Sequence, residues 1–467
     1  MHRNASPVTH APVRVLTVLL VADIAFAFQQ TAIIPAIPTV QQQLHTSQAW
    51  AAWLLSAYLM VATVATPALG RYADLHGRKR VLLATLVSFL IGSVGAALSP
   101  NIAVLIIFRA VQGIGGAVFP LTFAVVRDEI RGERVSRAIG LLTGGFAVGT
   151  GLGFGVGGWL DQAISWRVIF AAGAVLVAVG TAAVVWGVPR SRTTQQGRLD
   201  VWGTVLLGTC TVGVLLALTL GTEVGWLRPG PIALLVAAVA LGAAWVRVES
   251  RVAEPLVDLH VFRGRSVLLA NAATVGLGWA MFGCFFLVPQ LLRTRPDRAH
   301  YGFGVEATLT GIYLLPAALG QLVAGPLSDR LARRFTSGRV FSAGLVLAAV
   351  ACALFATTHG DVWQVLLASL VLGAASGLVI QTSGDVVTQR VPPELTSVST
   401  ALNSTVRRFA GGIGAQVSAT LLAGVATTAG GPSHASFTVA FVVAAALALV
   451  GAALALFVPA GVPSAHA

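Results

Sequence analysis

Long apolar runs alternate along the whole chain with short polar segments that hold charged residues, Pro and Gly. Each run is close to the ~20 residues that an α-helix needs to cross a ~30 Å hydrocarbon layer. A transmembrane β-barrel would instead show alternating segments of about ten residues, and the chain has no such pattern. The pattern therefore predicts an all-α polytopic membrane protein with fourteen transmembrane helices. Their expected bounds are 13–36, 50–70, 81–98, 102–126, 137–158, 167–187, 201–221, 231–249, 266–291, 304–325, 339–357, 363–384, 398–424 and 434–458.

One short pattern recurs at the ends of two predicted helices. Gly70-x-x-x-Asp74 closes the second helix, and Gly325-x-x-x-Asp329 followed by Arg330 closes the tenth. Paired repeats that enclose a site at the membrane midplane are typical of secondary transporters. We therefore expect two six-helix bundles separated by a linker and two central transmembrane helices. The expected bounds of these three parts are 1–187, 188–265 and 266–467.

Composition and charge agree with this topology. The 467 residues are 56% hydrophobic with a mean hydropathy of +0.83, and the formal net charge is +13. With a cytoplasmic N-terminus, 22 of the 30 basic residues fall on the cytoplasmic side, 5 on the outer side and 3 within spans. Such a bias is the positive-inside rule, so the net charge requires no nucleic-acid partner, and both termini are expected in the cytoplasm. The dominance of Arg over Lys and of Ala, Gly and Val indicates a bacterial plasma membrane.

The segment GRYADLHGRKR, residues 70–80, concentrates charge between the second and third predicted helices. Its glycines allow these helices to approach and to reverse sharply, and Asp74 can pair with Arg78 or lie at the positive N-terminal end of a neighbouring helix. A loop that only sets topology would explain the basic residues but neither the aspartate nor the glycines. We therefore expect a cytoplasmic gate that forms in one conformation. Its expected residues are Gly70, Asp74, Gly77, Arg78 and the partial copy Asp329 and Arg330.

Asp23 is the only carboxylate well inside a predicted span, about ten residues or ~15 Å deep. Intramembrane ionisable groups are costly and usually mark a pathway or a fixed partner. Arg407 and Arg408 lie at a similar depth in the thirteenth predicted helix, and at most one of these adjacent residues can face Asp23. We hypothesise an Asp23–Arg pair that joins the two halves until Asp23 is protonated. A static pair that only aids packing is the alternative.

Three ordered motifs resemble the major facilitator superfamily. GRYADLHGRKRVLL resembles the loop between its helices 2 and 3, and LIIFRAVQGIGGA (105–117) resembles its helix-4 motif. Five glycines of the fifth predicted helix keep the spacing of its helix-5 antiporter motif. The fourteen spans, with SWRVIF (165–170) and EPLVDLHVFRGR (254–265), resemble the fourteen-helix drug:proton antiporter family. The resemblance covers essentially the whole chain and implies a major facilitator fold.

The helix-5 motif departs from the family at one position. Phe154 stands where the family has a proline, which kinks helix 5 in relatives and is associated with exchange rather than uptake. Glycines alone permit close helix packing, so Phe154 weakens the implied antiport but not the implied packing. The motif glycines are Gly140, Gly149, Gly153, Gly157 and Gly158.

The resemblance also implies roles for other residues. Arg109, about seven residues into the fourth predicted helix, has a role in proton coupling by resemblance, although an arginine there could instead extend to the outer interface. By resemblance, helices 1, 4, 9 and 12 line the pathway, which indicates an apolar, aromatic cavity with few amides. Aromatic residues in spans also serve packing or face lipid. The expected lining residues are Phe26, Gln29, Gln30, Phe119, Phe123, Trp279, Phe282, Phe286, Gln290 and Gln381.

These features predict a proton-coupled secondary transporter that exports hydrophobic or amphipathic small molecules, a multidrug-type efflux protein that works by alternating access. We expect a monomer in the lipid bilayer, with protons and a small lipophilic substrate as its partners. No enzyme, metal or cofactor is expected, because the sequence has no nucleophile–base or metal-ligand cluster. Three alternatives stay open: an exporter of a dedicated metabolite or lipid, an importer, and a non-transporting membrane receptor.

Overall fold

The computed structural model describes residues 11–130, 132, 134–189, 200–252, 264–296, 301–358, 360–388, 396–424 and 432–458. Most of the predicted segments 188–200 and 254–265 lie outside these residues. The helices are α1 (Ala11–Thr31), η1 (Ile34–Ala36), α2 (Ile37–Gln43), α3 (Gln48–His76), α4 (Arg78–Ala97), α5 (Ile102–Gly113), η2 (Ile114–Ala117), α6 (Val118–Glu129), α7 (Arg134–Ala163), α8 (Trp166–Gly187), α9 (Val201–Val224), α10 (Pro229–Glu249), α11 (Arg265–Arg293), α13 (Ala307–Phe335), α14 (Ser337–Ala356), α15 (Val362–Thr388), α16 (Thr396–Gly424) and α17 (His434–Leu456).

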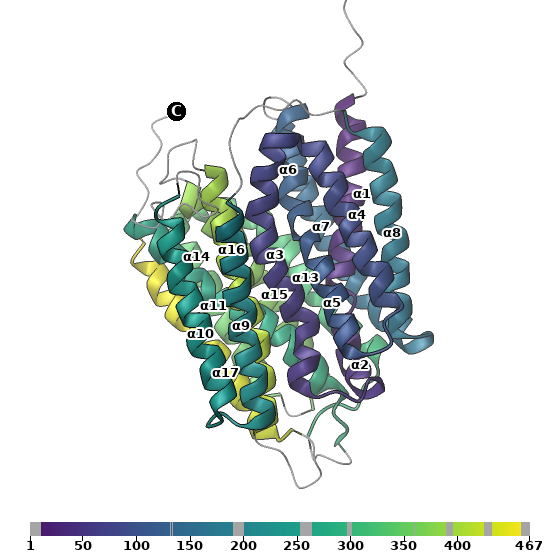
Figure 1. The fold of residues 1–467 in the computed structure, drawn as a ribbon, viewed down its shortest axis with the longest axis vertical. Helices are drawn as coiled ribbons and strands as arrows, with labels where there is room; N and C mark the ends of the chain where they lie inside the picture. The colour runs from purple at the N-terminus through teal and green to yellow at the C-terminus, as the bar shows by residue number, and fades with distance from the viewer. Residues whose placement is uncertain are drawn as a thin grey trace, which may run out of the picture.

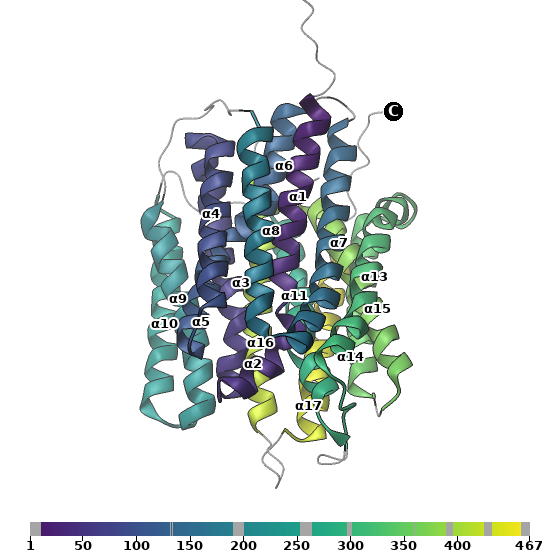
Figure 2. The same cartoon turned by 90° about the vertical axis from the view of Figure 1, so that its right-hand side faces the viewer.

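The long helices form two bundles that lie side by side (Figure 1). In the first bundle α1 packs on α7 and α8, and α4 packs on α5 and α8. In the second, α13 packs on α15, α11 on α16 and α17, and α14 on α15 and α17. The bundles meet along two helix pairs, α3 with α16 and α7 with α13. The hairpin of α9 and α10 stands at the edge of the molecule (Figure 2), where α9 contacts both α3 and α16.

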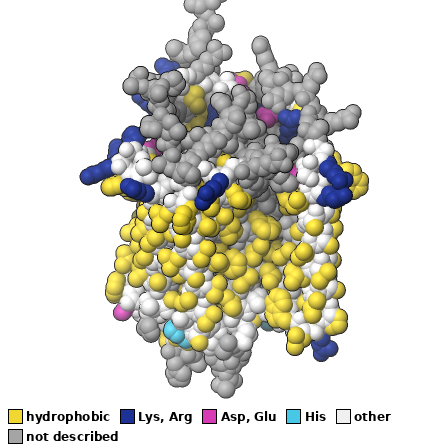
Figure 3. Space-filling model, turned by 90° about the vertical axis from the view of Figure 1, so that its left-hand side faces the viewer, with side chains coloured by type: hydrophobic (Ala, Val, Ile, Leu, Met, Phe, Trp, Pro, Cys, Tyr) yellow, Lys and Arg dark blue, Asp and Glu magenta, His cyan; other side chains and the backbone are white. Residues whose placement is uncertain are grey.

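An apolar belt crosses the face of the molecule seen in Figure 3, and the Lys and Arg side chains on this face gather mainly above one edge of the belt. Thirteen described helical segments are long and apolar enough to cross a membrane. The remaining predicted span, 398–424, corresponds to α16, which has similar length but lower hydropathy because it contains Arg407, Arg408 and many hydroxyl side chains. We call the end of the bundle that holds the α3–α4 turn the basic end, and the other the opposite end.

Two segments, each predicted as one span, are divided into shorter helices at proline or glycine residues. The first, 13–36, ends as an α-helix at Thr31 and continues as η1 and α2, where Pro35 and Pro38 lie in the first turns of these short helices. The fourth, 102–126, is divided by the short η2 around Gly115 and Gly116. A Cβ at Gly116 would lie 2.4 Å from the Ala62 Cβ, so this stretch approaches α3 closely. The interruptions therefore bring backbone near the centre of the bundle.

Candidate functional site

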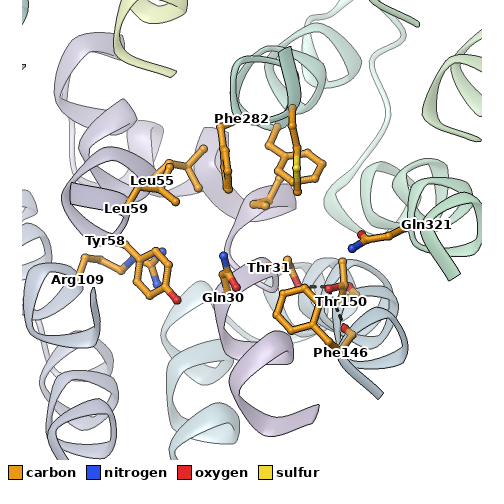
Figure 4. Close-up of a pocket in the computed structure, with 13 residues that line it drawn as sticks. Gln30, Thr31, Leu55, Tyr58, Leu59, Arg109, Phe146, Thr150, Phe282 and Gln321 are labelled. Carbon is orange, nitrogen blue, oxygen red and sulfur yellow. Dashed lines mark hydrogen bonds between the residues drawn. The ribbon is translucent and has the colours of Figure 1, made fainter. Parts of the chain in front are cut away.

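A mostly apolar cavity lies between the two bundles (Figure 4), and the empty space in and around it, parts open to solvent included, is about 390 Å³. The polar lining residues are Gln30, Thr31, Tyr58, Arg109, Thr150 and Gln321. The apolar lining residues are Ile34, Leu55, Leu59, Phe146, Met281, Phe282 and Phe285. Both bundles contribute, so a molecule in this cavity would contact residues that move relative to one another when the bundles rearrange.

Arg109 is held by a buried network within the first bundle. Its Nε donates to the Leu54 carbonyl oxygen at 2.8 Å, and its Nη1 donates to the Gln112 Oε1 at 2.8 Å. The Gln112 Nε2 in turn donates to the Ser93 hydroxyl at 2.8 Å. The guanidinium carbon also lies 4.8 Å from the centroid of the Tyr58 ring, a cation–π distance. Arg109 is fully buried, so it does not extend to the outer interface.

Of the ten predicted lining residues, Gln30 and Phe282 line this cavity. Gln29 is buried and donates to Ser93, while Phe26 packs on Phe89 at a ring distance of 5.6 Å. The remaining six also lie outside this lining: Phe119, Phe123, Trp279, Phe286, Gln290 and Gln381. Sequence reasoning missed Tyr58 and Gln321, because α3 and α13 were not among the helices expected to line the pathway.

The predicted ion pair between Asp23 and an arginine is not formed among the described residues, which corrects the hypothesis for this conformation. Asp23 is fully buried, and its carboxylate oxygens lie 3.0 and 3.1 Å from the Thr122 hydroxyl. Arg408 is instead bonded to the Thr66 hydroxyl and donates to the Gly116 carbonyl oxygen at 3.1 Å. The rotation of α16 thus directs Arg408 to α3 and η2 rather than to α1.

A polar cluster joins the two bundles at the opposite end. The Asp161 carboxylate accepts a hydrogen bond from the Thr39 hydroxyl at 2.5 Å and lies 3.6 Å from the Arg293 Nη1. The Arg293 Nη1 also donates to the Thr39 hydroxyl at 2.9 Å, and the Asp161 side chain is only 1% exposed. Asp161 lies beyond the predicted span 137–158, because α7 continues to Ala163. Asp23 is therefore not the only carboxylate buried in a helix.

An amide pair extends the same contact. The Gln290 Nε2 donates to the Gln41 Oε1 at 2.7 Å, from α11 to α2. The backbone N–H of Thr308 donates to the Gln162 Oε1 at 3.1 Å, from α13 to α7. Gln290 thus takes part in a contact between the bundles at the opposite end rather than in the cavity lining.

The distance between α7 and α13 narrows from the basic end to the opposite end. A Cβ added at Gly140 would meet no atom within 4 Å, one at Gly144 would lie 3.8 Å from Leu322, and one at Gly151 would lie 3.3 Å from Ala318. A Cβ at Gly158 would lie 2.2 Å from the Ala307 carbonyl oxygen. The two bundles are thus pressed together at the opposite end.

The helix-5 motif glycines support the predicted close packing. A Cβ at Gly149 would lie 2.7 Å from the Ile24 carbonyl oxygen, one at Gly153 2.1 Å from the Thr31 hydroxyl, and one at Gly157 2.2 Å from the Ala32 carbonyl oxygen. These three glycines therefore face α1. Phe154 is fully buried, and its ring lies 5.5 Å from that of Phe285 on α11, in an edge-to-face contact between the bundles.

The predicted gate at the basic end is partly formed. Gly77 has φ +95°, a conformation that favours glycine, and it makes the sharp turn between α3 and α4. The Arg78 Nη2 lies 3.3 Å from the Asp74 carboxylate, its Nη1 donates to the Ala124 carbonyl oxygen at 2.9 Å, and it is also bonded to Asp128. Arg78 thus joins α3, α4 and α6 within one bundle.

The other expected gate positions are open in this conformation, so their role in a gate stays a prediction. A Cβ at Gly70 or Gly325 would meet no atom within 4 Å, although a Cβ at Gly377 on α15, in the same bundle, would lie 2.9 Å from the Gly325 backbone nitrogen. Asp329 and Arg330 are exposed at the end of α13. Together with the open surroundings of Gly140, these positions show no contact of the gate residues between the bundles within the part of the chain that the structure describes. The physical reason is that the bundles diverge toward the basic end.

Comparison with known families agrees with this architecture. The family model of the Major Facilitator Superfamily matches residues 19–415 and 307–467. The chain belongs to this superfamily. Its fold also matches a crystal structure of a mutant of the nucleoside transporter NupG, with a TM-score of 0.69 at 14% sequence identity, over 95% of this chain and 100% of that one. At this identity the match shows the fold alone.

The names of the relatives describe different transport functions. The chain is 28% identical to the tetracenomycin C resistance and export protein of Streptomyces glaucescens, over 90% of this chain and 78% of that protein. It is 29% identical to the uridine/deoxyuridine transporter of Lactococcus lactis subsp. cremoris, over 77% of this chain and 76% of that protein. The chain is therefore a transporter of the superfamily, and both export and nucleoside transport occur among its relatives.

Proposed function

We propose that this protein exports hydrophobic or amphipathic small molecules across a bacterial plasma membrane, as a monomer driven by the proton gradient. The observation that carries the proposal is the cavity between the bundles, which has aromatic and aliphatic walls and a few polar groups. The relative named for tetracenomycin C resistance and export supports this direction and this kind of substrate. The basic end faces the cytoplasm in this proposal, as the positive-inside rule requires.

Alternating access follows from the contacts between the bundles. The cluster of Asp161, Thr39 and Arg293 holds them together at the opposite end, whereas Gly70 and Gly325 have open surroundings at the basic end. With the basic end in the cytoplasm, this is the inward-facing state, from which a substrate for export enters. Transport then requires the cluster at the opposite end to break and the basic end to close.

Asp23 is the group that we assign to proton coupling. The Thr122 hydroxyl lies 2.8 Å from the Phe119 carbonyl oxygen as well as beside the Asp23 carboxylate, but a hydroxyl has only one hydrogen to donate. If that hydrogen goes to Phe119, Asp23 must carry the proton of the Asp23–Thr122 bond. If Asp23 is ionised, the hydroxyl turns to it and leaves the carbonyl. One proton therefore changes the hydrogen bonding between α1 and α6.

Inside-out vesicles test the function directly. We expect vesicles that contain the protein to accumulate tetracenomycin C when a pH gradient, acidic inside, is imposed, and to lose it when an ionophore collapses the gradient. Vesicles from cells without the protein serve as the control. Accumulation that is unaffected by the ionophore would contradict proton coupling, and no accumulation above the control would contradict export of this kind of molecule.

Uptake of a nucleoside is the second candidate. It is favoured by the relative named as a uridine/deoxyuridine transporter and by Phe154 in place of the motif proline. Right-side-out vesicles given labelled uridine distinguish the two. Gradient-driven entry of uridine, without accumulation of tetracenomycin C in inside-out vesicles, would replace export by uptake.

A further inference from the structure

The cavity contains a buried cation that its own surroundings do not neutralise. Arg109 is the one charged residue in the cavity lining, which contains no carboxylate. Among the described residues Arg109 forms no ion pair, and its Nη2 has no hydrogen-bond partner. A buried guanidinium is costly unless an anion or a full set of acceptors compensates it. The Arg109 Nη2 is therefore a buried donor without a partner, on a residue that lines the cavity.

Tyr58 supplies a second free donor beside it. Its hydroxyl is buried and has no partner among the described residues, and its ring lies against the Arg109 guanidinium. Figure 4 shows Tyr58 between Arg109 and the middle of the cavity, with Gln30 facing it from α1. The ring contact leaves the phenol hydrogen available. A hydroxyl and a guanidinium edge placed together form a site that accepts a carboxylate or a similar anionic group.

Neighbouring charges add to this preference. Arg408 on α16 bonds to Thr66 on α3 and to the Gly116 carbonyl oxygen in η2. Asp23, a buried acid of the first bundle, is bonded to Thr122 and is not part of the lining. The Asp161 carboxylate is occupied by Thr39 and Arg293. The charges around the cavity are therefore positive on the Arg109 side and are not balanced by an acid that faces it.

We propose that the cavity binds organic anions, with the anionic group on the Arg109 Nη2 and the Tyr58 hydroxyl and an apolar body against Met281, Phe282 and Phe285. The inference rests on the proposed function in one respect, since it takes this cavity as the transport site. It narrows that function by charge: the lining offers a lipophilic cation no carboxylate, and such a cation would meet Arg109 at close range.

The geometry separates the two parts of such a ligand. Arg109 and Tyr58 come from α5 and α3 on one wall, whereas Met281, Phe282 and Phe285 come from α11 of the other bundle. The ligand would thus contact the first bundle through its charge and the second through its apolar surface. Aromatic side chains supply large contact areas for a flat hydrocarbon body.

Binding without any gradient tests the inference on the full-length protein in lipid nanodiscs. The probes are naphthylacetate, naphthylacetamide and naphthylethylammonium, which share one aromatic body and carry a negative, a neutral and a positive group. Binding is measured by calorimetry at neutral pH, with protein-free nanodiscs as the background. We expect naphthylacetate to bind about tenfold more tightly than the amide, as for a hydrogen bond to a charged group. The ammonium probe should bind no more tightly than the amide.

Three variants assign the preference to the two donors. Arg109→Gln should abolish the preference for the acetate, and Tyr58→Phe, which keeps the ring on Arg109, should reduce it about threefold. Tyr313→Phe is the matched control, since it removes the same hydroxyl from a tyrosine on α13 that does not line the cavity. It should keep the full preference. If Arg109→Gln does not fold, as judged by gel filtration, the comparison of Tyr58→Phe with its control still tests the anion site.

Each other outcome overturns the inference. Equal binding of the three probes, or tighter binding of the ammonium probe, excludes an anion site. A preference for the acetate that persists in both Tyr58→Phe and Arg109→Gln places the anion elsewhere. The vesicle experiment with tetracenomycin C is independent of these results. Anion binding without gradient-driven transport would support the anion site and reject the proposed function. Gradient-driven transport without a preference for the acetate probe would support the proposed function and reject the anion site.

Discussion

At the scale of single residues, the buried polar groups of the first bundle have different surroundings. Arg109 is bonded to Leu54 and Gln112 and keeps one free donor, while Asp23 is bonded to one hydroxyl. An ionised carboxylate with one neutral partner is costly in an apolar interior, whereas a protonated one can donate to that partner. Asp23 is therefore more easily neutralised by its surroundings than Arg109 is.

Asp23→Asn is predicted to abolish proton-driven transport. The amide keeps the shape of the carboxyl group and can bond to Thr122, so folding should be unaffected, but it cannot gain or lose a proton at Asp23. Accumulation of tetracenomycin C in inside-out vesicles should fall to the background of protein-free membranes. Asp361→Asn is the control, because that aspartate is exposed. Retained gradient-driven accumulation in Asp23→Asn would show that the coupling proton binds elsewhere.

At the scale of helices, the packing of α7 depends on which side each glycine faces. Gly157 faces the backbone of Ala32, whereas a Cβ at Gly155 would lie 3.6 Å from the flexible Leu315 side chain, an ordinary contact. Helix pairs in membranes gain van der Waals contact when small residues let their backbones approach. The same helix thus carries one side that tolerates a methyl group and one that does not.

Gly157→Ala is predicted to destabilise the protein and Gly155→Ala to leave it nearly unchanged. A methyl group at Gly157 would lie 2.2 Å from the Ala32 carbonyl oxygen and would force α1 and α7 apart. Overpacking of this kind costs about 1–3 kcal/mol. Thermal unfolding of the detergent-purified variants measures the difference. Equal melting temperatures would contradict the close approach of the two helices.

Helix α9, which belongs to the hairpin at the edge of the molecule, is bonded to both bundles through one hydroxyl. The Thr219 hydroxyl accepts from the Trp53 Nε1 at 2.8 Å and from the Gln416 Nε2 at 2.8 Å, and it donates to the Leu215 carbonyl oxygen at 3.0 Å. Trp53 belongs to α3 and Gln416 to α16. The extra helical pair therefore contributes to the contact between the bundles.

Thr219→Val is predicted to lower stability, because two buried donors lose an acceptor. The expected cost is about 1–3 kcal/mol. Thr211→Val on the same helix is the matched control: Thr211 is equally buried, and the hydrogen bond recorded for its hydroxyl is a donation to Leu207 within α9. Chemical unfolding followed by tryptophan fluorescence measures both. A control variant that is destabilised as much as Thr219→Val would refute the special role of this hydroxyl.

At the scale of the whole molecule, the two bundles are held at one end and diverge at the other. The closed end uses a charged cluster, Asp161 with Thr39 and Arg293, and an amide pair, Gln41 with Gln290. Removal of one partner leaves a buried charge unpaired, which is strongly unfavourable. The free-energy difference between the two access states should therefore depend on Arg293.

Arg293→Gln is predicted to open the end that is closed here. Spin labels at Leu98→Cys and Asp361→Cys, exposed positions of the two bundles at this end, measure the distance by pulsed electron resonance. Cys210→Ala removes the half-buried native thiol from the background. We expect a longer distance to appear in a larger fraction of Arg293→Gln molecules than in the otherwise identical protein.

Arg167→Gln is the control for this measurement. Arg167 is another arginine at the same end, but it donates to the Ser99 carbonyl oxygen at 3.1 Å and stacks on Trp166, all within the first bundle. Its replacement should leave the distribution of distances unchanged. Identical distributions in Arg293→Gln and Arg167→Gln would reject the cluster as the contact that closes this end.

Residues of the site show which features can be predicted from the sequence and which cannot. Gln29 and Gln30 are adjacent and chemically identical, yet only Gln30 lines the cavity, since neighbours on a helix point about 100° apart. Phe282 lines the cavity and Phe286 does not, although residues four apart lie on the same face of a helix, so their depth along α11 decides. Asp161 could have been found from the length of the apolar run before Trp166, had the helix been extended past 158. Tyr58 has no such signal, because its role depends on Arg109 from another helix.

The sequence by itself determined the spanning helices, the glycine motif of α7, the turn at Gly77 and membership of the superfamily. These are properties of residues close together in the chain: apolar length, residue spacing and backbone conformation. Only the tertiary structure decided that Arg408 bonds to α3 rather than to Asp23, that Asp161 meets Arg293, and that Arg109 keeps a free donor in the cavity. Such contacts depend on the rotation of each helix, which the packing of helices distant in sequence sets.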